Sequence, residues 1–301
     1  MKGWLVNDTL TCIPGTKTFW HDLLENIPGL IDMTGGYTDF GSLPIKIERE
    51  VKNNGAPDYI IRNATFFRKM NLPCKQLSLL QDIYTGQARE QQIDVCNNSE
   101  ITIFNSKYTY ENYRNEIKSK VKIISLGIDF DLFKPSTETI PEILPNSILY
   151  VGSSANYPKG FNTIINLIDT TNYNFCLVMK DDYKLFHPRV RVYNMVSHDM
   201  LVKIYNSCGM LICTSITETQ HLASIEAGAC NLPVLTTDIR ALYNEPDGDW
   251  GLKVKDNNYI EKIDYILNNK DKFSPRQFFL NKGFNKKDCM NSWKTLIENL
   301  Y

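Results

Sequence analysis

The stretch Thr214–Asp238 reads TSITETQHLASIEAGACNLPVLTTD and places two carboxylates in one local structure. Seven residues separate Glu218 from Glu226. The pattern predicts a short loop that turns into a helix, with Glu218 at the helix mouth and Glu226 about two turns inside. The run 233–235 then predicts a buried strand. Because free backbone amides at a helix N-terminus bind anions, the two carboxylates could hydrogen-bond hydroxyls on either side of a bound diphosphate.

Short apolar runs alternate with amphipathic stretches along the chain, which is typical of βα units and parallel sheets. The segment 134–147 holds three prolines and few strongly apolar residues, so it is the predicted linker. We therefore expect two α/β domains, residues 1–138 and 139–301. The predicted strands are 3–6, 59–61, 76–80, 100–104, 121–125, 147–151, 174–179, 190–193, 209–213 and 233–235. The predicted helices are 19–27, 108–118, 161–168, 199–206, 221–228, 259–268 and 291–300.

Composition excludes several classes of protein. A net charge of −1 over 301 residues argues against wholesale electrostatic binding to nucleic acid or an anionic membrane. The eight cysteines contain no Cys-x-x-Cys pair, which favours buried reduced thiols over a zinc site or a disulfide scaffold. No run reaches the roughly 18 apolar residues of a membrane span, and the first residues are too polar for a secretory signal. We expect a cytoplasmic protein without an integral membrane segment, and peripheral attachment to a membrane stays open.

The chain resembles the retaining glycosyltransferases of the GT-B fold, specifically the large family-four group (glycosyl transferases group 1). The Glu-x7-Glu segment is the first of four ordered matches, which together cover roughly residues 100–301. The other three are the donor-domain strand and basic loop (148–152 and 158–161), the passage that ends the acceptor domain (104–106, 124–129 and 133–135), and the aromatic pair of the closing helix (Trp293 and Tyr301).

The resemblance implies two Rossmann-like domains that face one another across a cleft, with a C-terminal helix that crosses back. It implies transfer of a sugar from a nucleotide-diphosphate sugar, most often a UDP- or GDP-sugar, to a hydroxyl acceptor, with no metal or other cofactor. Glu226 would bind the ribose hydroxyls of the donor, because a carboxylate accepts from two adjacent hydroxyls. Glu218 would contact the transferred sugar, and Lys159 would stabilise the charge of the leaving diphosphate.

Other donor contacts are expected around these three residues. The turn into the helix would present backbone amides to the diphosphate; its residues are Thr219, Gln220, His221 and Leu222. The family usually has a glycine in this turn, so the backbone path of the turn stays open. His221 could hydrogen-bond a phosphate or a sugar hydroxyl, but a lone loop histidine is more often solvated, and that is the preferred interpretation. Gly152 ends the first donor strand. Ser153 follows where the family has an arginine, so one positive charge is missing. Lys180 could replace it, although an exposed lysine at a strand end is the commoner explanation.

In the acceptor half, Gly15 and Thr16 lie where the family has a glycine-rich loop over the donor. Gln81 and Asp82 follow a predicted strand where the family often has histidine and aspartate. Gln81 cannot act as a general base, so Asp82 is the candidate that orients the acceptor. A capping or turn aspartate explains Asp82 equally well.

A metal-dependent enzyme is the second enzymatic hypothesis. Two Asp-x-Asp motifs, Asp129–Asp131 and Asp247–Asp249, could place oxygen ligands on magnesium or manganese. Asp129 is already part of the passage that resembles the family, and Asp247 lies in a Pro-Asp-Gly turn. The metal-free reaction is therefore the preferred hypothesis.

The acceptor is open among a glycan, a lipid and a small molecule. A hydroxylated DNA base is a minority alternative, based on Arg62, Arg68, Lys69 and Lys75 interleaved with Phe66 and Phe67. A catalytically degenerate nucleotide-sugar-binding or scaffold protein is the non-enzymatic alternative. The presence of both glutamates and of Lys159 argues against it.

Overall fold

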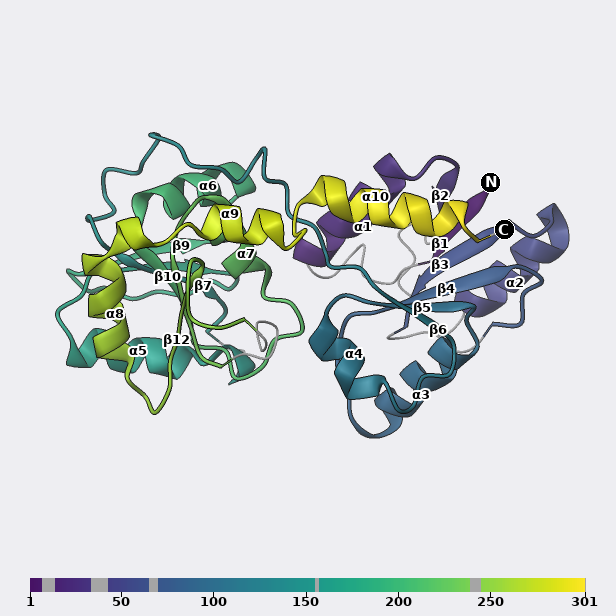
Figure 1. Cartoon of the computed structure of the whole chain (residues 1–301), viewed down its shortest axis with the longest axis horizontal. Coiled ribbons are helices and arrows are strands. Elements are labelled where there is room, and N and C mark those ends of the chain that lie inside the picture. The colour runs from purple at the N-terminus through teal and green to yellow at the C-terminus, as the bar shows by residue number, and fades with distance from the viewer. Residues whose placement is uncertain (7–13, 34–42, 65–69, 155–156, 239–244, 301) are drawn as a thin grey trace. The chain divides into compact units, whose positions relative to one another are not determined.

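The computed structural model describes residues 1–301 except 7–13, 34–42, 65–69, 155–156, 239–244 and 301 (Figure 1). The chain forms two compact units. The first contains Met1–Gly127 and Lys287–Tyr301, and the second contains Ile128–Lys286. Each unit is built around its own six-stranded sheet, in which the paired strands run parallel. The expectation of two α/β units with parallel sheets is confirmed.

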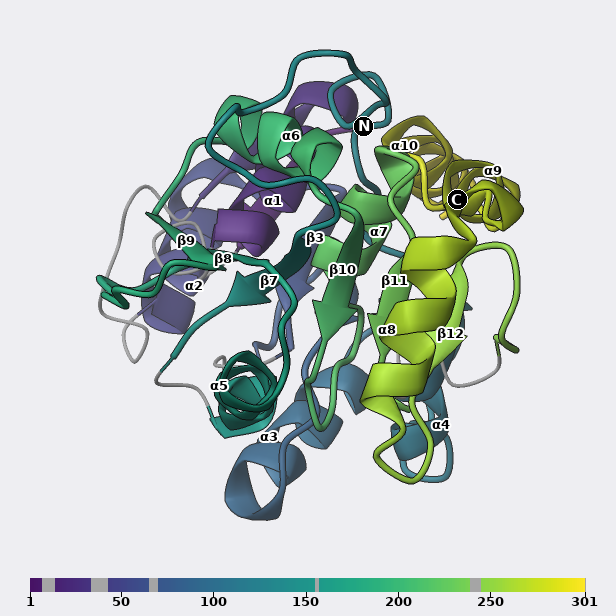
Figure 2. The same ribbon diagram turned by 90° about the vertical axis from the view of Figure 1, so that its left-hand side faces the viewer.

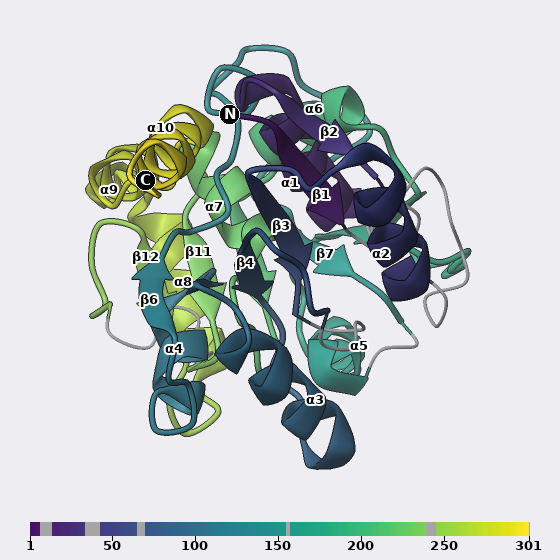
Figure 3. The same ribbon diagram turned by 90° about the vertical axis from the view of Figure 1, so that its right-hand side faces the viewer.

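The sheet of the first unit has the strand order β2-β1-β3-β4-β5-β6. These strands are β2 (Leu30–Asp32), β1 (Gly3–Val6), β3 (Tyr59–Asn63), β4 (Lys75–Leu80), β5 (Ile101–Phe104) and β6 (Lys120–Ile123). The helices of this unit are α1 (Pro14–Asn26), α2 (Leu43–Asn54), α3 (Gly86–Asn97), α4 (Lys107–Tyr113) and α10 (Lys286–Glu298). The central strands are buried on both faces, which suits a parallel sheet covered by helices (Figure 3).

Helix α10 returns to the first unit at the end of the described chain and lies beside α1 (Figure 1). The side chain of Trp293 on α10 is fully buried, and its ring centroid lies 6.2 Å from that of Phe19 on α1. This is the crossing back of a C-terminal helix that the sequence predicts. Tyr301, the second member of the expected aromatic pair, lies outside the described residues.

The sheet of the second unit has the strand order β12-β11-β10-β7-β8-β9 (Figure 2). These strands are β12 (Gly251–Lys253), β11 (Val234–Thr236), β10 (Met210–Cys213), β7 (Ile148–Gly152), β8 (Phe175–Met179) and β9 (Val190–Asn194). The helices are α5 (Phe161–Thr170), α6 (His198–Ser207), α7 (Leu222–Ala229), α8 (Tyr259–Asn268) and α9 (Pro275–Asn281), with short 3-10 turns at Tyr157–Lys159 and Lys270–Lys272.

Two apolar clusters cover the two faces of this second sheet. Helices α5 and α8 contribute to one cluster through Ile164 and Ile263. Helices α6, α7 and α9 contribute to the other through Tyr205, Ile225 and Phe279. Figure 2 shows α5 and α8 on one side of the strands and α6 and α7 on the other. The helix that carries Glu226 is therefore fixed between the sheet and α9.

The division of the chain differs from the predicted boundary at residue 138. Ile128 pairs with Asn285 in a β-bridge, and Phe133 lies in the same apolar cluster as Tyr205, so residues 128–138 pack into the second unit. Residues 287–301 pack into the first unit rather than the second. Prolines mark the sequence near the boundary, but these packing contacts determine the compact units.

Several helices and strands also differ from their predicted bounds. Helix α4 ends at Tyr113 instead of residue 118, and the chain continues as a turn in which the amides of Glu116 and Ile117 both donate to the carbonyl oxygen of Tyr113. Strand β6 is displaced toward the N-terminus, and α10 begins earlier than predicted. The sequence prediction lacked β2, α2, α3, β12 and α9.

Candidate functional site

The donor residues predicted in the second unit follow the carboxyl ends of β7, β8 and β10, the edge of the sheet where ligands bind in open α/β folds. Strand β7 ends at Gly152, and the amide of Lys180, just after β8, donates to the carbonyl oxygen of Gly152 at 2.9 Å. A Cβ atom on Gly152 would meet the ring of Tyr150, with the nearest atom at 2.4 Å. Glycine therefore lets the chain turn closely past this tyrosine at the strand end.

The loop with Lys159 is tied to the loop that follows β10. Gly160 has a φ of 64° and forms the N-cap of α5, and a Cβ atom there would lie 2.0 Å from the carbonyl oxygen of Thr214. The hydroxyl of Thr214 donates to the carbonyl oxygens of Lys159 and Gly160, each at 3.0 Å. The amide of Ile216 donates to the carbonyl oxygen of Pro158 at 2.7 Å. These contacts bring two segments that are distant in sequence to one place.

Lys159 and Glu218 meet there as an ion pair. Lys159 Nζ lies 2.5 Å from Glu218 Oε1, and both side chains are largely buried. Burial alone would raise the pKa of Glu218, but the neighbouring charges of His221 and Lys159 and the hydrogen bond from Lys159 hold that pKa below its usual range. Glu218 is therefore a carboxylate at neutral pH, and Lys159 is its counter-ion.

Glu226 lies on α7, four residues after Leu222, so it is about one turn inside the helix rather than the predicted two. Its environment differs from that of the ion pair. Its Oε2 accepts a hydrogen bond of 2.9 Å from the hydroxyl of Tyr205 on α6. Burial raises the pKa of Glu226, and the hydrogen bond from Tyr205 lowers it again in part. The two glutamates therefore differ. The pKa of Glu218 is lowered, which favours the carboxylate, whereas the pKa of Glu226 is raised, so that Glu226 takes up a proton at a higher pH than an ordinary glutamate.

The turn into α7 is closed by His221, which is the N-cap residue. Only 7% of His221 is exposed. Its Nδ1 accepts from the amide of Ser224 at 3.2 Å and lies 2.6 Å from the Ser224 hydroxyl oxygen, while its Nε2 lies 3.4 Å from Cys213 Sγ. The interpretation of His221 as a solvated loop histidine is wrong. Its ring is a buried cap that occupies one amide of the helix N-terminus.

Thr219 and Gln220 lie in the turn before this cap, and Leu222 is the first residue of α7. All three are partly exposed, as expected for residues that line a helix mouth. The amide of Leu222 is one of the N-terminal amides that a helix leaves for a cap or a ligand.

Where the family has an arginine after β7, this chain instead has serines, one of which binds a carboxylate. The residue after Ser153 is Ser154, whose amide donates to both carboxylate oxygens of Asp181 at 3.1 Å and whose hydroxyl also donates to Asp181. Lys180 is an exposed residue, yet neighbouring atoms bury its ammonium group enough to lower its pKa, and the charge of Lys159 lowers the pKa further. Lys180 and Lys159 therefore share one electrostatic neighbourhood.

The first unit places Asp82 just after β4, where it is half-buried and burial raises the pKa of its carboxyl group. Gln81 is buried, and its carbonyl oxygen accepts from the side chain of Asn105 at 3.2 Å. Gly15 and Thr16 differ from expectation. They lie in the first turn of α1, which begins at Pro14, because proline fits the start of a helix; they do not form a loop.

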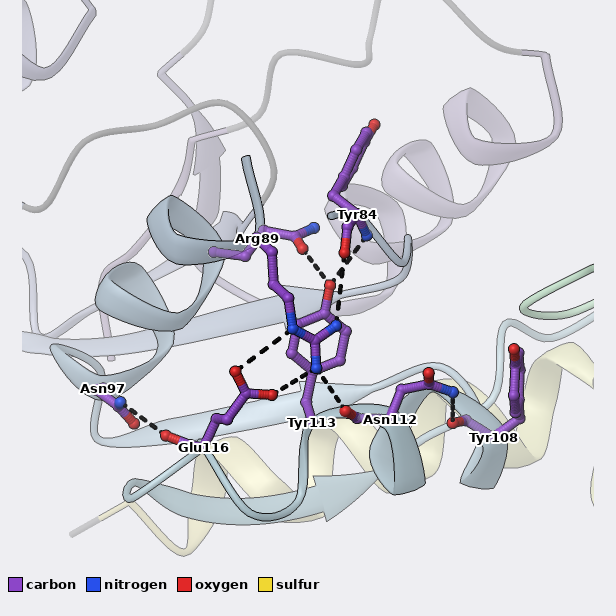
Figure 4. Close-up of polar contacts among 8 residues, drawn as sticks. Tyr84, Arg89, Asn97, Tyr108, Asn112, Tyr113 and Glu116 are labelled. Carbon is purple, nitrogen blue, oxygen red and sulfur yellow. Dashed lines mark hydrogen bonds and ion pairs between the residues drawn. The ribbon is translucent and has the colours of Figure 1, made fainter. Parts of the chain in front are cut away.

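Side chains of α3 and α4 hold the segment from Asp82 to Tyr84, and Figure 4 shows the contact between Tyr84 and Tyr113. Gln92 Nε2 donates to the carbonyl oxygen of Asp82 at 3.2 Å, and the amide of Tyr84 donates to the hydroxyl of Tyr113 at 3.1 Å. The Tyr113 hydroxyl in turn donates to Gln92 Oε1 at 2.5 Å. The guanidinium carbon of Arg89 lies 3.9 Å from the Tyr113 ring centroid. This network fixes the backbone on both sides of Ile83.

Both Asp-x-Asp motifs have structural partners. Asp129 Oδ1 accepts from the amides of Asp131 and Leu132, and its Oδ2 pairs with Lys286 at 2.9 Å. Asp247 Oδ1 accepts from the amide of Lys253, and its Oδ2 lies 3.7 Å from Lys262 Nζ. Across the described parts of the chain, no group of three or more His, Cys, Asp or Glu side chains is arranged to hold a metal ion.

No sequence pattern marks Tyr205, Thr214 or Ser224 as site residues. Tyr205 follows Leu201 and Ile204 on one face of a helix, a pattern that indicates core packing. Thr214 and Ser224 are small polar residues near a strand end and a helix start, where such residues are common. Only the folded chain shows that they contact Glu226, Lys159 and His221.

The geometry of the second unit can be compared with known proteins. Residues 145–269 match the model of the glycosyl transferases group 1 family. This group 1 segment holds Lys159, Glu218 and Glu226, together with the strand ends that position them. No curated protein sequence matches the chain.

Solved structures extend the likeness to the whole chain. Anabaena Alr3699/HepE in complex with UDP is 14% identical, with a TM-score of 0.79 and complete coverage of both chains. A glycosyltransferase from Rickettsia africae is 15% identical, with a TM-score of 0.71 and coverage of 99% of this chain and 98% of that one. Sucrose-phosphate synthase from Thermosynechococcus elongatus is 16% identical, with a TM-score of 0.71 and coverage of 92% and 82%. The chain therefore has the GT-B fold that the sequence predicted.

Two further observations bear on the setting of the site. No helix in the described ranges has the length and apolar character needed to cross a membrane. The seven cysteines that the structure describes are free thiols, as expected from their spacing; Cys12 lies outside those residues.

Proposed function

We propose that this chain is a retaining glycosyltransferase that moves a sugar from a nucleotide-diphosphate sugar to a hydroxyl acceptor without a metal ion. One observation carries the proposal: Lys159 and Glu218 meet at 2.5 Å at the mouth of α7, inside the segment that matches glycosyl transferases group 1. A cation and a carboxylate next to a helix N-terminus suit a ligand that combines a diphosphate with sugar hydroxyls.

In this proposal, donor binding rearranges the ion pair. The diphosphate replaces Glu218 as the partner of the Lys159 ammonium group, and the Glu218 carboxylate accepts hydrogen bonds from hydroxyls of the transferred sugar. Lys159 then stabilises the negative charge that develops on the leaving diphosphate. Glu226 binds the ribose hydroxyls. Retention of the anomeric configuration is supported by the resemblance of the Glu-x7-Glu segment.

We propose that Asp82 orients the hydroxyl of the acceptor. Its carboxyl group is half-buried with a raised pKa, and its backbone is held by Gln92. A more basic carboxylate is a better hydrogen-bond acceptor for this hydroxyl, and the leaving diphosphate of the donor takes the hydroxyl proton as the new glycosidic bond forms. We propose a glycan, a lipid or a small molecule as acceptor.

A DNA acceptor receives little support from the residues that suggested it. Arg62 is fully buried, and Lys75 Nζ donates to the carbonyl oxygen of Leu300, so neither is presented as a surface phosphate contact. Arg68, Lys69 and both interleaved phenylalanines lie outside the described residues.

Metal independence is supported by the contacts of the two Asp-x-Asp motifs. Asp129 and Asp247 each use both carboxylate oxygens for backbone amides and a lysine. Binding a cation would require these contacts to break. UDP is the first donor nucleotide to test, because the similar Anabaena protein was solved in complex with UDP and with UDP-glucose. The free thiols suit a reducing compartment, which supports a cytoplasmic location.

Isothermal titration of the purified chain with UDP, GDP and UDP-glucose tests donor binding. We expect one nucleotide to bind and Lys159→Ala and Glu226→Ala each to weaken it at least tenfold, which is about 1.4 kcal/mol. Lys184→Ala is the matched control, since this exposed lysine pairs with Asp182 at 3.8 Å and lies outside the candidate site. Absence of binding by the wild-type chain to every nucleotide would reject the proposal.

Turnover distinguishes the enzyme from a degenerate binding protein. With the bound donor and a panel of hydroxyl acceptors, we expect release of the nucleoside diphosphate that persists in EDTA and a product with the donor's anomeric configuration by proton NMR. Loss of turnover in EDTA would indicate a metal-dependent enzyme. Inversion of the anomer would reject retention, and binding without turnover would favour the scaffold alternative.

A further inference from the structure

Tyr205 links α6 to α7, the helix that carries Glu226. It lies on α6, only 1% exposed, and its hydroxyl is 2.9 Å from Glu226 Oε2. The same hydroxyl lies 3.4 Å from the carbonyl oxygen of Ala223, one turn earlier on α7. A tyrosine hydroxyl has one proton, and the shorter contact to a carboxylate is the stronger of the two. Tyr205 therefore fixes one oxygen of Glu226.

The other carboxylate oxygen of Glu226 has a different environment. Glu226 as a whole is partly exposed, although its neighbours on α7, Ile225 and Ala227, are buried. Among the described residues, no hydrogen bond to Glu226 Oε1 accompanies the bond to Oε2. One oxygen is thus held by Tyr205, while the partly exposed carboxylate keeps its second oxygen for a ligand.

We propose that Tyr205 is a positioning residue of the donor site, whose hydroxyl holds one oxygen of Glu226 so that the other is presented to the vicinal hydroxyls of the donor ribose. The inference rests on the proposed function, because it takes Glu226 to be the ribose ligand. A carboxylate held at one oxygen loses less side-chain freedom on binding than one that rotates freely. Tyr205 would therefore act on donor affinity rather than on the chemical step.

The position of Tyr205 is itself fixed from the other side by Phe133. The two ring centroids lie 6.1 Å apart in an edge-to-face arrangement. The carbonyl oxygens of Phe133 and Phe130 accept from the guanidinium of Arg276 at 2.9 and 3.0 Å. The Phe-Lys-Pro passage thus has a role that its sequence does not reveal. Its residue Phe133 packs against the ring of Tyr205 and, through Tyr205, supports Glu226.

Several charged groups share the neighbourhood of Glu226 and influence its charge. Besides Tyr205, these groups are His198 on α6, His221 before α7 and Lys180 after β8. Each of them lowers the pKa of Glu226, whereas burial, the largest effect, raises it. The thiol of Cys230 also lies nearby, at the end of α7. Without the hydroxyl of Tyr205, the pKa of Glu226 would rise further. Glu226 would then become protonated, and lose its ability to bind ribose as a carboxylate, at a higher pH than in the wild type.

The test is Tyr205→Phe, which keeps the ring in the core and removes only the hydroxyl. With the nucleotide that the wild-type chain binds, UDP first, we expect the dissociation constant to rise roughly three- to tenfold and kcat to stay within about twofold. The matched control is Tyr173→Phe in the same unit, which removes another tyrosine–carboxylate hydrogen bond, the 2.5 Å contact with Asp264. The control should leave nucleotide affinity unchanged.

Two measurements separate positioning from general loosening of the fold. Titrations between about pH 5 and pH 8.5 should show that Tyr205→Phe loses nucleotide affinity at a higher pH than the wild type, whereas a structural defect would weaken binding equally at every pH. In a double-mutant cycle, Tyr205→Phe should add no further loss once Glu226 is replaced by alanine.

The outcomes are distinct. If the wild-type chain binds a nucleotide but Tyr205→Phe binds it equally well, with an unchanged pH profile, the role of Tyr205 is rejected while the proposed function stands. If Tyr205→Phe still weakens binding in the Glu226→Ala background, its effect does not pass through Glu226, and the inference is likewise rejected. If the wild-type chain binds no nucleotide, the proposed function fails first and the inference falls with it.

Discussion

Gly160 is the residue whose backbone most directly determines where Lys159 lies. It has a φ of 64°, a conformation that residues with a side chain rarely adopt, and the space for a Cβ atom is taken by the carbonyl oxygen of Thr214 at 2.0 Å. The sequence shows the Lys-Gly pair plainly. It does not show why glycine is needed, because Thr214 lies far along the chain.

We expect Gly160→Ala to lower the free energy of unfolding of the second unit by about 1–3 kcal/mol and to weaken nucleotide binding, because the loop with Lys159 must move away from Thr214. Urea denaturation and isothermal titration measure the two effects. Gly283→Ala is the matched control, since Gly283 also has a positive φ, 74°, but no atom of the described residues lies within 4 Å of its would-be Cβ. An equal loss in both variants would show that the contact with Thr214 is unimportant.

The ion pair of Lys159 and Glu218 makes a prediction about pH. Because the folded chain lowers the pKa of Glu218, the pair's contribution to stability is present above the unfolded pKa and is lost as the pH falls through the folded value. Lys159→Met removes the counter-ion. We expect the variant to be less stable than the wild type near neutral pH and the difference to shrink below about pH 4.5.

Thermal denaturation of both chains over this pH range measures the difference. A gap between the melting temperatures that does not shrink at any pH below about 4.5 would contradict the ion pair, because protonation of Glu218 removes its attraction to Lys159.

Helices α3 and α4 show how two secondary-structure elements together hold one loop. The side chains of Gln92 and Tyr113 bind the backbone of Asp82 and Tyr84 and also bind one another (Figure 4). Arg89 adds an ion pair with Glu116 and a contact over the Tyr113 ring. The loop that carries Asp82 is therefore rigid because of the helices, not because of its own sequence.

We expect Tyr113→Phe to lower the free energy of unfolding of the first unit by about 1–3 kcal/mol, because a buried hydrogen-bonding group of Gln92 loses its partner. With the acceptor identified, KM for the acceptor should rise while nucleotide affinity stays unchanged. Tyr110→Phe is the control on the same helix, since it keeps its ring contact with Phe104. A rise in the nucleotide dissociation constant instead would contradict a role confined to the acceptor loop.

The strands at the centre of each sheet could be predicted because their residues form continuous apolar runs, as in β8 with the sequence FCLVM. Helix α3 could not, because its sequence GQAREQQIDVCN is mostly polar and shows little helical periodicity. In the candidate site, the spacing of Glu218 and Glu226 was visible. The pairing of Lys159 with Glu218 was not, since 59 positions separate them, and neither was the burial of His221 against Cys213.

At the scale of the whole molecule, each unit has a fully buried tryptophan whose replacement should destabilise that unit. Trp293 of α10 is fully buried in the first unit, and Trp250 is fully buried in the second, where it belongs to the cluster of Tyr205 and Phe279. Replacing either by alanine removes a large part of one core, at a cost of about 3–5 kcal/mol.

We expect Trp293→Ala to increase hydrogen–deuterium exchange in β1, β3, β4 and β5, with β7, β8 and β10 unchanged, and Trp250→Ala to do the reverse. Mass spectrometry of peptides from each unit measures both. If Trp293→Ala instead increased exchange in β7 and β10, α10 would be stabilising the second unit, contrary to its packing against α1.

The return of the chain to its first unit has a consequence for biosynthesis. The ribosome makes the first unit's sheet early, but α10, whose Trp293 completes the packing against Phe19, emerges only after residue 286. The second unit, Ile128–Lys286, is complete before that point. The half that is translated second is therefore able to finish folding first, and the nascent first half exposes the apolar surface that α10 later covers. A chaperone that binds apolar segments would find its main target there.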